Sequence, residues 1–204
     1  MEMAEDTLQN ILDCGRDEFL QKGFEGASLR SIAKAAGVTT GAIYGYFPDK
    51  KALFDALVAR PAGELLDKYI ETQKEFAQRP AEKQAAEMVQ ASDESIAWMV
   101  EYIYGHYDAF KLLVCCSAGT EYADYVNQMV EVETQATLRF IDAVRGAGQQ
   151  VRDVDEQLIH ILANALFSGM FEIVAHDMPK GKAIGYINSL KEFYTAGWFQ
   201  ILGL

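Results

Sequence analysis

Two short helical patterns joined by a glycine turn constrain the fold of this chain more than any other feature. Ser28 is suited to cap the first pattern and Gly37 to end it, and Thr39 begins the second after a break of about three residues. A connection this short between two helices is typical of a helix-turn-helix. In the second helix, Ile43 and Phe47 lie four apart and would face inward. The residues left looking outward are Thr40, Gly41, Tyr44 and Tyr46.

The exposed face of the second helix is poorly made for stability and well suited to lie against a polar surface. The surrounding motifs run in order along the chain as Ser28-Leu29-Arg30, Ile32-Ala33, Ala36-Gly37-Val38 and Gly41-Ala42-Ile43-Tyr44-Gly45-Tyr46-Phe47, followed by Lys50 and Leu53. Over roughly residues 7 to 58 they resemble the DNA-binding domain of the TetR family of bacterial transcriptional regulators. The rest of the chain carries no comparable signature.

The resemblance implies two kinds of DNA contact. Positions at which TetR-like domains hold phosphates are occupied here by Ser28, Thr39, Tyr44, Tyr46 and Lys50. Positions nearer the base edges or the thymine methyl group are occupied by Arg30, Thr40 and Ala42, and Gly41 completes the expected DNA-binding set. Gly45 departs from the family pattern, which often has a bulkier residue there, so one side-chain contact is missing. A dimer would place two such helices in successive major grooves, about 34–36 Å apart.

The charge distribution fits a local DNA-binding surface rather than general coating of nucleic acid. The chain has 204 residues and a net charge of −12, whereas proteins that coat nucleic acid are usually basic. Between Lys22 and Lys51, however, five cations stand against two carboxylates, and most of the acidic residues lie beyond residue 60. A small positive face on an acidic body would orient the molecule on DNA.

Helical periodicity runs through nearly the whole chain. Half of the residues are hydrophobic, proline is scarce and strand-like alternation is hard to find, so we expect an all-α protein of about nine helices. We place a three-helix DNA-binding domain at residues 1–48 and a larger helical ligand-binding and dimerisation domain at residues 49–204. The expected helical segments are 4–22, 28–37, 39–47, 49–57, 64–76, 81–107, 108–116, 120–146, 153–176 and 182–202.

Three residues are expected to stop or interrupt these helices. Gly23 should end the first one. Pro61 lies inside a continuing helical pattern, so either one helix ends there and another begins, or a single helix kinks and sets the angle between the DNA-binding and regulatory parts. Ser92 could cap a new start within 81–107. The side chains expected to meet in the core of the N-terminal domain are Leu12, Phe19, Ile32, Ile43 and Phe47.

An aromatic stretch from Ile96 to Tyr107 suggests a ligand cavity. Trp98, Tyr102 and His106 follow one helical face at intervals of four residues. Apolar rings with polar tips favour a pocket, although such a stripe is also typical of plain core packing. The expected ligand-binding residues are Trp98, Tyr102, His106, Phe110, Tyr125, Phe140 and Phe167. Glu121, if buried there, would favour a cationic or hydrogen-bonding ligand.

The last two helical segments are apolar over most of their circumference and therefore need to be covered on two sides. Small residues such as Gly169 and Gly197 would let another helix approach closely. We expect the pair to meet its symmetry mate in a four-helix bundle, and the alternative is a helix pair inside the core of one chain. The expected dimer-interface residues are Leu162, Ala165, Gly169, Ile187, Leu190, Tyr194 and Trp198.

Cysteine and histidine patterns argue against several other classes of protein. Cys14, Cys115 and Cys116 are odd in number and lack C-x-x-C spacing, so neither a disulfide framework nor a zinc site is indicated, and a reducing cytosol fits best. The adjacent pair is expected to fill the core, against the alternative of a redox sensor. Both Glu-to-His pairs of the C-terminal segments are four residues apart, whereas the di-iron motif requires three, so no metal is expected.

Two further patterns are missing from the sequence. No apolar run approaches the roughly 18 residues of a membrane span, and no signal-peptide pattern opens the chain, so a cytoplasmic protein without a membrane partner is expected. No catalytic triad order, glycine-rich phosphate loop or zinc-protease motif is present, so neither a cofactor nor an enzymatic activity is expected.

These features predict a homodimeric transcriptional regulator. With the resemblance, we expect it to bind a double-stranded operator and to act as a repressor that a small-molecule effector releases from DNA. The alternatives are an enzyme that uses His106 as its acid or base, and a helical small-molecule-binding protein whose helix-turn-helix is vestigial.

Overall fold

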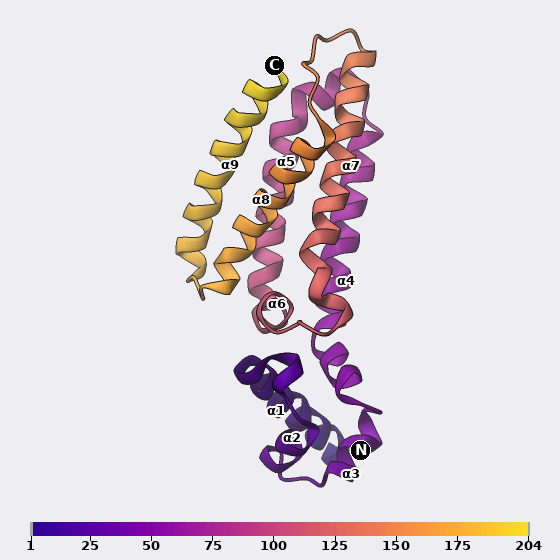
Figure 1. The fold of residues 1–204 in the computed structure, drawn as a ribbon, viewed down its shortest axis with the longest axis vertical. Coiled ribbons are helices and arrows are strands. Elements are labelled where there is room, and N and C mark those ends of the chain that lie inside the picture. The colour runs from indigo at the N-terminus through magenta and orange to yellow at the C-terminus, as the bar shows by residue number, and fades with distance from the viewer. Residues whose placement is uncertain (1, 204) are drawn as a thin grey trace. The chain divides into compact units, whose positions relative to one another are not determined.

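The chain folds into helices throughout, as its sequence predicts. The structure is a computed structural model that describes residues 2–203, and within that range it contains nine α-helices, one short 3₁₀-helix and no strand (Figure 1). Two compact units are present. Unit 1 contains the chain up to Glu64 together with His106–Tyr125, and unit 2 contains Leu65–Gly105 and the chain from Val126 onward. In chain order the elements are α1 Glu2–Gly26, α2 Leu29–Ala35, α3 Thr40–Tyr46, α4 Lys50–Ala77, α5 Ala81–Gly105, α6 Tyr107–Cys115, η1 Glu121–Asp124, α7 Tyr125–Gly146, α8 Glu156–Ala175 and α9 Lys180–Leu202.

Local capping explains the two short helices of unit 1. The Oγ of Ser28 accepts a hydrogen bond at 3.1 Å from the backbone N–H of Ser31, at the start of α2. The Oγ1 of Thr39 does the same for α3, where the N–H of Ala42 donates at 3.1 Å. Between the helices Gly37 has a φ of 69°, a left-handed conformation that glycine adopts without a Cβ clash. The predicted helix-turn-helix is therefore present.

The first helix, α1, is longer than predicted and is interrupted at a glycine. It extends from Glu2 to Gly26, but Gly23 has φ 69° and ψ 170°, which are not helical angles. Gly23 thus stops the regular helix, as expected, and one further turn follows it. The buried face of α1 carries Ile11, Gly15 and Phe19, so the predicted core residue Leu12 is wrong by one position: it is only half-buried, and Ile11 is buried in its place.

Aromatic rings hold the core of unit 1 together. The ring of Phe54 on α4 meets the rings of Phe19 and Phe24 edge to face, with centroid distances of 5.1 and 5.4 Å. Gly15 lets α1 approach α4 closely, because a Cβ at this position would lie 3.2 Å from a methyl carbon of Leu53. The other predicted core residues are buried as expected, namely Phe19, Ile32, Ile43 and Phe47.

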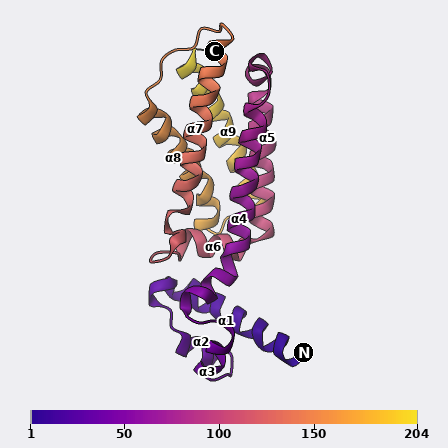
Figure 2. The ribbon, with the colours of Figure 1, turned by 90° about the vertical axis from the view of Figure 1, so that its right-hand side faces the viewer.

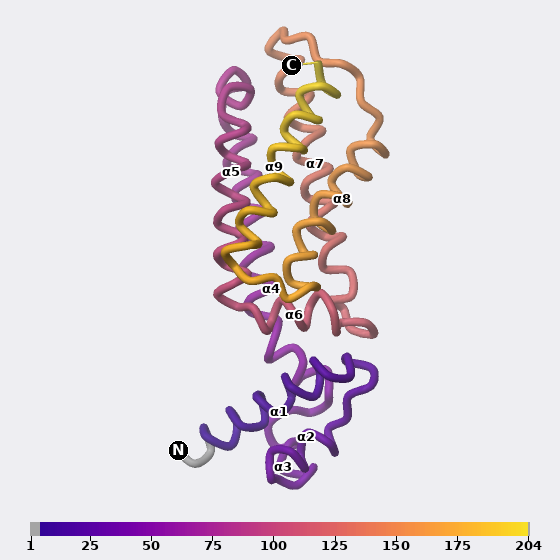
Figure 3. The backbone as a smooth tube through the Cα atoms, turned by 90° about the vertical axis from the view of Figure 1, so that its left-hand side faces the viewer, coloured from indigo at the N-terminus to yellow at the C-terminus, as the bar shows by residue number. Residues whose placement is uncertain are grey.

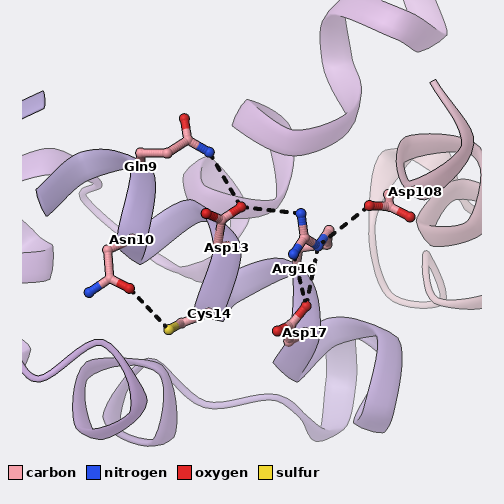
Figure 4. A network of polar contacts seen from close by, with 7 residues as sticks. All are labelled: Gln9, Asn10, Asp13, Cys14, Arg16, Asp17 and Asp108. Carbon is pink, nitrogen blue, oxygen red and sulfur yellow. Dashed lines mark hydrogen bonds and ion pairs between the residues drawn. The ribbon is translucent and has the colours of Figure 1, made fainter. Parts of the chain in front are cut away.

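Unit 1 also includes α6 and η1, which are distant from α1 in the sequence. The backbone N–H of Phe24 donates to the carbonyl of Cys116 at 2.9 Å. Figure 4 shows Arg16 of α1 reaching Asp108 of α6, at 3.5 Å, while it also bonds two aspartates of its own helix. Exposed ion pairs of this kind add little stability. Packing therefore accounts for most of the attachment, through the buried α6 residues Ala109, Phe110, Leu112 and Leu113.

Unit 2 is a helical bundle. The helices α4, α5 and α7 run along a common direction (Figure 2), and α9 lies beside both α5 and α8 (Figure 3). The interruption predicted at Ser92 is wrong, because α5 is continuous through it. Of the two alternatives for Pro61, the single helix is correct, since α4 continues through the proline. The helix predicted from Thr120 starts instead with η1, which the Thr120 hydroxyl caps, and α7 begins at Tyr125.

The compact units and the predicted domains are different divisions of the chain. The predicted DNA-binding domain ends at residue 48, whereas unit 1 adds the first half of α4 and the segment His106–Tyr125. These additions depend on contacts between residues far apart in the sequence, which periodicity does not report. The boundary between residues 48 and 49 stays a prediction about which part of unit 1 meets DNA.

One helix of unit 2 is more apolar than expected. An 18-residue window of α8 reaches a mean hydropathy of 1.7, so by length and composition alone this helix could cross a membrane. The expectation that no segment is this apolar is therefore wrong. The reason is that α8 packs one face inside the unit, through residues such as Phe167 and Met170, and carries Leu158 and Ile161 on its exposed face.

Candidate nucleic-acid interface and internal cavity

The second helix of the helix-turn-helix, α3, combines a buried anchor with exposed aromatic side chains. Ile43 is fully buried, whereas 56% of Tyr44 and 38% of Tyr46 are exposed. A phenol exposed on a helix of seven residues does not contribute to the core, and its hydroxyl can donate to a phosphate oxygen. No atom lies within 4 Å of the position that a Cβ would take at Gly45, so the missing side chain leaves open space beside the tyrosines.

The structure gathers most of the predicted DNA-binding residues at the start of α2 and on α3. Ser28, Arg30, Thr39 and Gly41 are exposed, and Thr40 and Ala42 are half-buried. The hydroxyls of Ser28 and Thr39 already accept backbone hydrogen bonds as helix caps. Any phosphate that they bind must therefore be held by the remaining hydroxyl proton or by the N–H groups beside it.

Lys50 differs from the other predicted contacts, because its ammonium is already bound. The Nζ atom donates to the carbonyls of Phe24, Glu25 and Ala27, at 2.5, 3.2 and 2.9 Å. It also lies 4.5 Å from the centroid of the Phe24 ring. These carbonyls belong to the end of α1 and the link to α2, where backbone oxygens lack helical partners. The geometry thus gives Lys50 a structural role at the α1–α2 link.

Unit 2 encloses a cavity of about 170 Å³ lined by five helices. Its wall is mostly apolar and aromatic, with hydroxyls from threonine and serine side chains between the rings. The rings that line it belong to Tyr69, Phe76, Phe140, Phe167 and Trp198. Ligand sites in proteins have this character, an apolar wall with a few polar groups that fix orientation.

The only charged side chain in the cavity wall, among the described residues, is Glu133 of α7. The Tyr69 hydroxyl donates to its Oε2, and the side-chain amide of Gln73 donates to the same oxygen at 3.0 Å. Burial raises the pKa of the Glu133 carboxyl, and the hydrogen bonds from Tyr69 and Thr137 offset part of that rise. Burial, together with the nearby Glu133 charge, also raises the pKa of Tyr69.

Most of the predicted ligand-binding residues lie away from this cavity. Phe140 and Phe167 line it. Trp98 and Tyr102 stack on each other on another face of α5, with a centroid distance of 5.1 Å, and do not reach the wall. The α5 residues that do reach it include Ser92, Ser95, Ile96 and Met99, so the prediction chose the wrong face of the helix.

The three remaining predicted ligand-binding residues belong to unit 1. Phe110 and Tyr125 are buried there, and the Tyr125 hydroxyl donates to the Ala62 carbonyl at 3.0 Å. His106 is exposed at the start of α6. Glu121 is also in unit 1, where it is exposed and pairs with Lys51 at 2.8 Å. The common cavity predicted for these residues is therefore wrong, because a continuous helix to Tyr107 was assumed and α5 ends at Gly105.

The surface of α8 and α9 carries an unusual number of exposed apolar side chains. We define the α8–α9 face by Leu158, Ile161, Ile184, Tyr186 and Phe193, of which Ile161 and Phe193 are 60% and 72% exposed. The residues predicted for a dimer interface are placed differently. Ile187 is buried within the chain, Leu190 packs 3.4 Å from the Cβ position of Gly169, and Trp198 lines the cavity. For these positions the alternative, packing inside one chain, is correct. Leu162 and Tyr194 are half-buried and Ala165 is exposed.

Comparison with known proteins decides the family. The sequence model described as "Bacterial regulatory proteins, tetR family" matches residues 11–57, which include α2, the turn and α3. The HTH-type transcriptional regulator AcrR of Shigella flexneri is 42% identical over 77 residues, which are 38% of this chain and 36% of AcrR. The chain belongs to the TetR family through this N-terminal segment. The match spans about a third of the length of AcrR, so it says nothing of the activity of the whole protein.

Solved TetR structures extend the likeness to the complete fold. NalD of Pseudomonas aeruginosa, described as the secondary repressor of a multidrug efflux pump, aligns over 99% of this chain and 98% of its own, with a TM-score of 0.56 and 21% identity. FadR of Bacillus subtilis, solved in complex with stearoyl-CoA, aligns over 90% and 95%, with a TM-score of 0.54 and 18% identity. At such identities the likeness establishes a shared TetR fold.

Sequence reasoning missed the polar group of the cavity. Glu133 lies on the apolar face of α7, in line with Met129, Thr137 and Phe140, at helical spacing. An acid in the middle of such a face was the available signal. Two other expectations concern possible reactive groups. Cys116 is buried, with a pKa that burial raises, whereas Cys115 is exposed, so the prediction that both fill the core is wrong for Cys115. Among the described residues, no group of three or more His, Cys, Asp or Glu side chains is placed to hold a metal ion.

Lys50→Met tests whether this lysine serves the fold or the DNA. Loss of its bonds to three carbonyls should lower the free energy of unfolding by about 1.5–3 kcal/mol, since hydrogen bonds to charged groups contribute in this range. Chemical denaturation followed by circular dichroism measures the loss. Lys51→Met is the control, because Lys51 is exposed and its pairs with Asp55 and Glu121 should matter much less. If Lys50 also neutralises a phosphate, the slope of log K against log salt should fall by about 0.9. An unchanged slope would leave it a purely structural residue.

Proposed function

We propose that this TetR-family chain is a dimeric, sequence-specific DNA-binding repressor, which a small molecule bound in the unit 2 cavity releases from its operator. The observation that carries the proposal is the exposed tyrosine pair on α3, held by buried Ile43 within a capped helix-turn-helix. The cavity supports the effector part of the proposal. FadR, which has the same fold, was solved with stearoyl-CoA, and NalD is described as a repressor. A DNA partner places the protein in the cytoplasm.

The path of the chain offers a route from the cavity to the DNA-binding helices. The backbone passes between the units at residues 64–65, 105–106 and 125–126. The helices that make these passages, α4, α5 and α7, are also three of the five that line the cavity, through residues such as Tyr69, Met99 and Glu133. A ligand that changes the spacing of these helices would therefore act on unit 1 through covalent connections.

Linkage sets the size of the effect that the effector must have. The ligand can release the operator only if it binds the DNA-free conformation more tightly than the DNA-bound one. A thousandfold release requires a differential binding free energy of about 4 kcal/mol. Two recognition helices that no longer match the groove spacing would provide such a difference, because both half-sites are then lost together.

Selection from a random duplex library, followed by mobility shift, tests DNA recognition and identifies the operator sequence at the same time. We expect a two-fold symmetric sequence to be enriched and its affinity to fall steeply with salt. Thr40→Ala combined with Tyr44→Ala should weaken binding to that sequence by about 10²-fold or more, since each lost base or phosphate contact costs about 1–3 kcal/mol. The control Gln128→Ala changes an exposed residue of α7 and should have no effect. Equal affinity of the double variant and the unaltered protein would refute the assignment of α3 as the recognition helix.

A further inference from the structure

The carboxylate of Glu133 lacks a partner of opposite charge in the cavity. Among the described residues, the wall contains no lysine, arginine or histidine. The groups that bond Glu133 are the neutral side chains of Tyr69, Gln73 and Thr137. Buried carboxylates are normally paired with a cation or bound to a metal, since burial of an unpaired charge is costly.

The hydrogen bonds around Glu133 fit the ionised rather than the protonated acid. The side-chain amide of Gln73 donates to the Tyr69 oxygen at 3.0 Å, so the single hydroxyl proton of Tyr69 is directed to Glu133. Gln73 directs its second N–H to the same carboxylate at 3.0 Å. An ionised carboxylate only accepts hydrogen bonds, which matches neighbours that all donate. The site is thus arranged for a negative charge, although burial raises the pKa of the group that must carry it.

The remaining surface of the cavity suits a cation with an apolar body. The faces of Tyr69, Phe76, Phe140, Phe167 and Trp198 surround the space. Aromatic faces attract positive charge through their quadrupole, and tryptophan does so most strongly. The volume of about 170 Å³ is close to the 150 Å³ of an engineered cavity that binds benzene, so a ligand body the size of one aromatic ring fits.

We propose that the cavity binds a small apolar amine or organic cation, with its positive nitrogen at the Glu133 carboxylate and its body among the aromatic side chains. This assignment deepens the proposed function, because the cavity is the effector site assigned there. The amine supplies the missing charge, and its N–H groups form charge-assisted hydrogen bonds with a carboxylate that Tyr69 and Gln73 hold in place. An anionic ligand of the same shape is excluded by repulsion from the same carboxylate.

Three ligands of matched shape test the proposal on the full chain without DNA. The amine 2-phenylethylamine, the neutral alcohol 2-phenylethanol and the anion phenylacetate share one ring and two carbon atoms beyond it. Isothermal titration calorimetry at neutral pH should give the amine an affinity at least about tenfold higher than the alcohol. Phenylacetate should bind weakest. Equal affinities for amine and alcohol, or no binding of the amine, would overturn the proposal.

Glu133→Gln tests the residue itself. It keeps the shape and hydrogen-bonding capacity of the side chain and removes the charge, so the preference for the amine over the alcohol should disappear while alcohol binding is retained. Glu131→Gln is the matched control, because Glu131 is exposed on the same helix and its loss should leave the preference unchanged. A preference that survives in Glu133→Gln would overturn the assignment. The comparison of the three ligands on the unaltered protein decides the matter even if this variant does not fold.

The effector role and the ligand class fail separately. Amine binding that depends on Glu133 but leaves the affinity for the selected operator unchanged supports the ligand class and contradicts release by the cavity ligand. Operator release by some other molecule, with no amine binding, supports the proposed function and overturns the ligand class.

Discussion

Ile161→Asp combined with Phe193→Asp is expected to convert the protein from a dimer to a monomer and to abolish specific operator binding. The two side chains are the most exposed large apolar residues of the α8–α9 face, at 60% and 72%. Exposed apolar residues are common when scattered singly, but a group on two adjacent helices is typical of an interaction site. A second copy of the same face is the simplest partner, because a two-fold interface is self-complementary.

The expected loss is large because each aspartate would be buried without a partner in the interface. An uncompensated buried charge costs about 3–5 kcal/mol, which for a single site corresponds to a roughly 10²–10³-fold weaker association. A two-fold axis repeats each change in both copies. Operator affinity should fall with the dimer, since a monomer reads only one half-site.

Analytical ultracentrifugation measures the association, and mobility shift on the selected operator measures the consequence. Ala97→Asp is the control, because it adds the same charge at an exposed position of α5. It should remain dimeric. If the double variant stays dimeric, the interface lies elsewhere on the chain, and the apolar character of the α8–α9 face would need another explanation.

Local chemistry is the part of this structure that the sequence predicts well. The capping residues Ser28 and Thr39, the left-handed Gly37 and the interruption at Gly23 each depend on neighbours within a few residues, and each is found as predicted. The inward position of Ile43 follows from helical spacing within one short helix. In such cases no distant part of the chain changes the outcome.

Contacts between distant residues are the part that it does not predict. The helix α5 is apolar on more than one side, with Trp98 and Tyr102 on one and Ile96 and Met99 on another, so periodicity alone did not identify the face that lines the cavity. Lys50 binds carbonyls 23 to 26 positions away, which no local pattern indicates. The acidic residue on the apolar face of α7 was visible, yet its meaning depended on Tyr69 and Gln73 of α4.

Phe54→Ala is expected to destabilise unit 1 by about 3–5 kcal/mol, the range observed for loss of a buried phenylalanine. Its ring is fully buried and contacts Phe19 and Phe24 of α1, and it lies 6.1 Å from the ring of Tyr122 in η1. Removal of the ring leaves a cavity between three segments at once. Domains have free energies of unfolding of about 5–15 kcal/mol, so this change alone would leave unit 1 marginally stable.

Two spectroscopic signals distinguish the units in the same sample. Both tryptophans of the chain, Trp98 and Trp198, belong to unit 2, so tryptophan emission reports that unit alone, whereas circular dichroism at 222 nm reports helices of both. In Phe54→Ala, part of the circular dichroism transition should move to lower temperature while the emission transition moves less. Phe167→Ala is the reciprocal control, because Phe167 is buried in unit 2 against Tyr69, and it should shift the emission transition instead.

The difference between the two transitions also bears on regulation. If Phe54→Ala lowers both transitions equally, the units unfold as one cooperative structure, and the prediction that unit 1 is destabilised selectively is wrong. If the transitions separate widely, little free energy couples the units. The effector can change operator affinity by no more than its differential binding free energy for the two conformations. A coupling well below about 4 kcal/mol would then be too small for a thousandfold release, and repression would have to be relieved by a smaller factor.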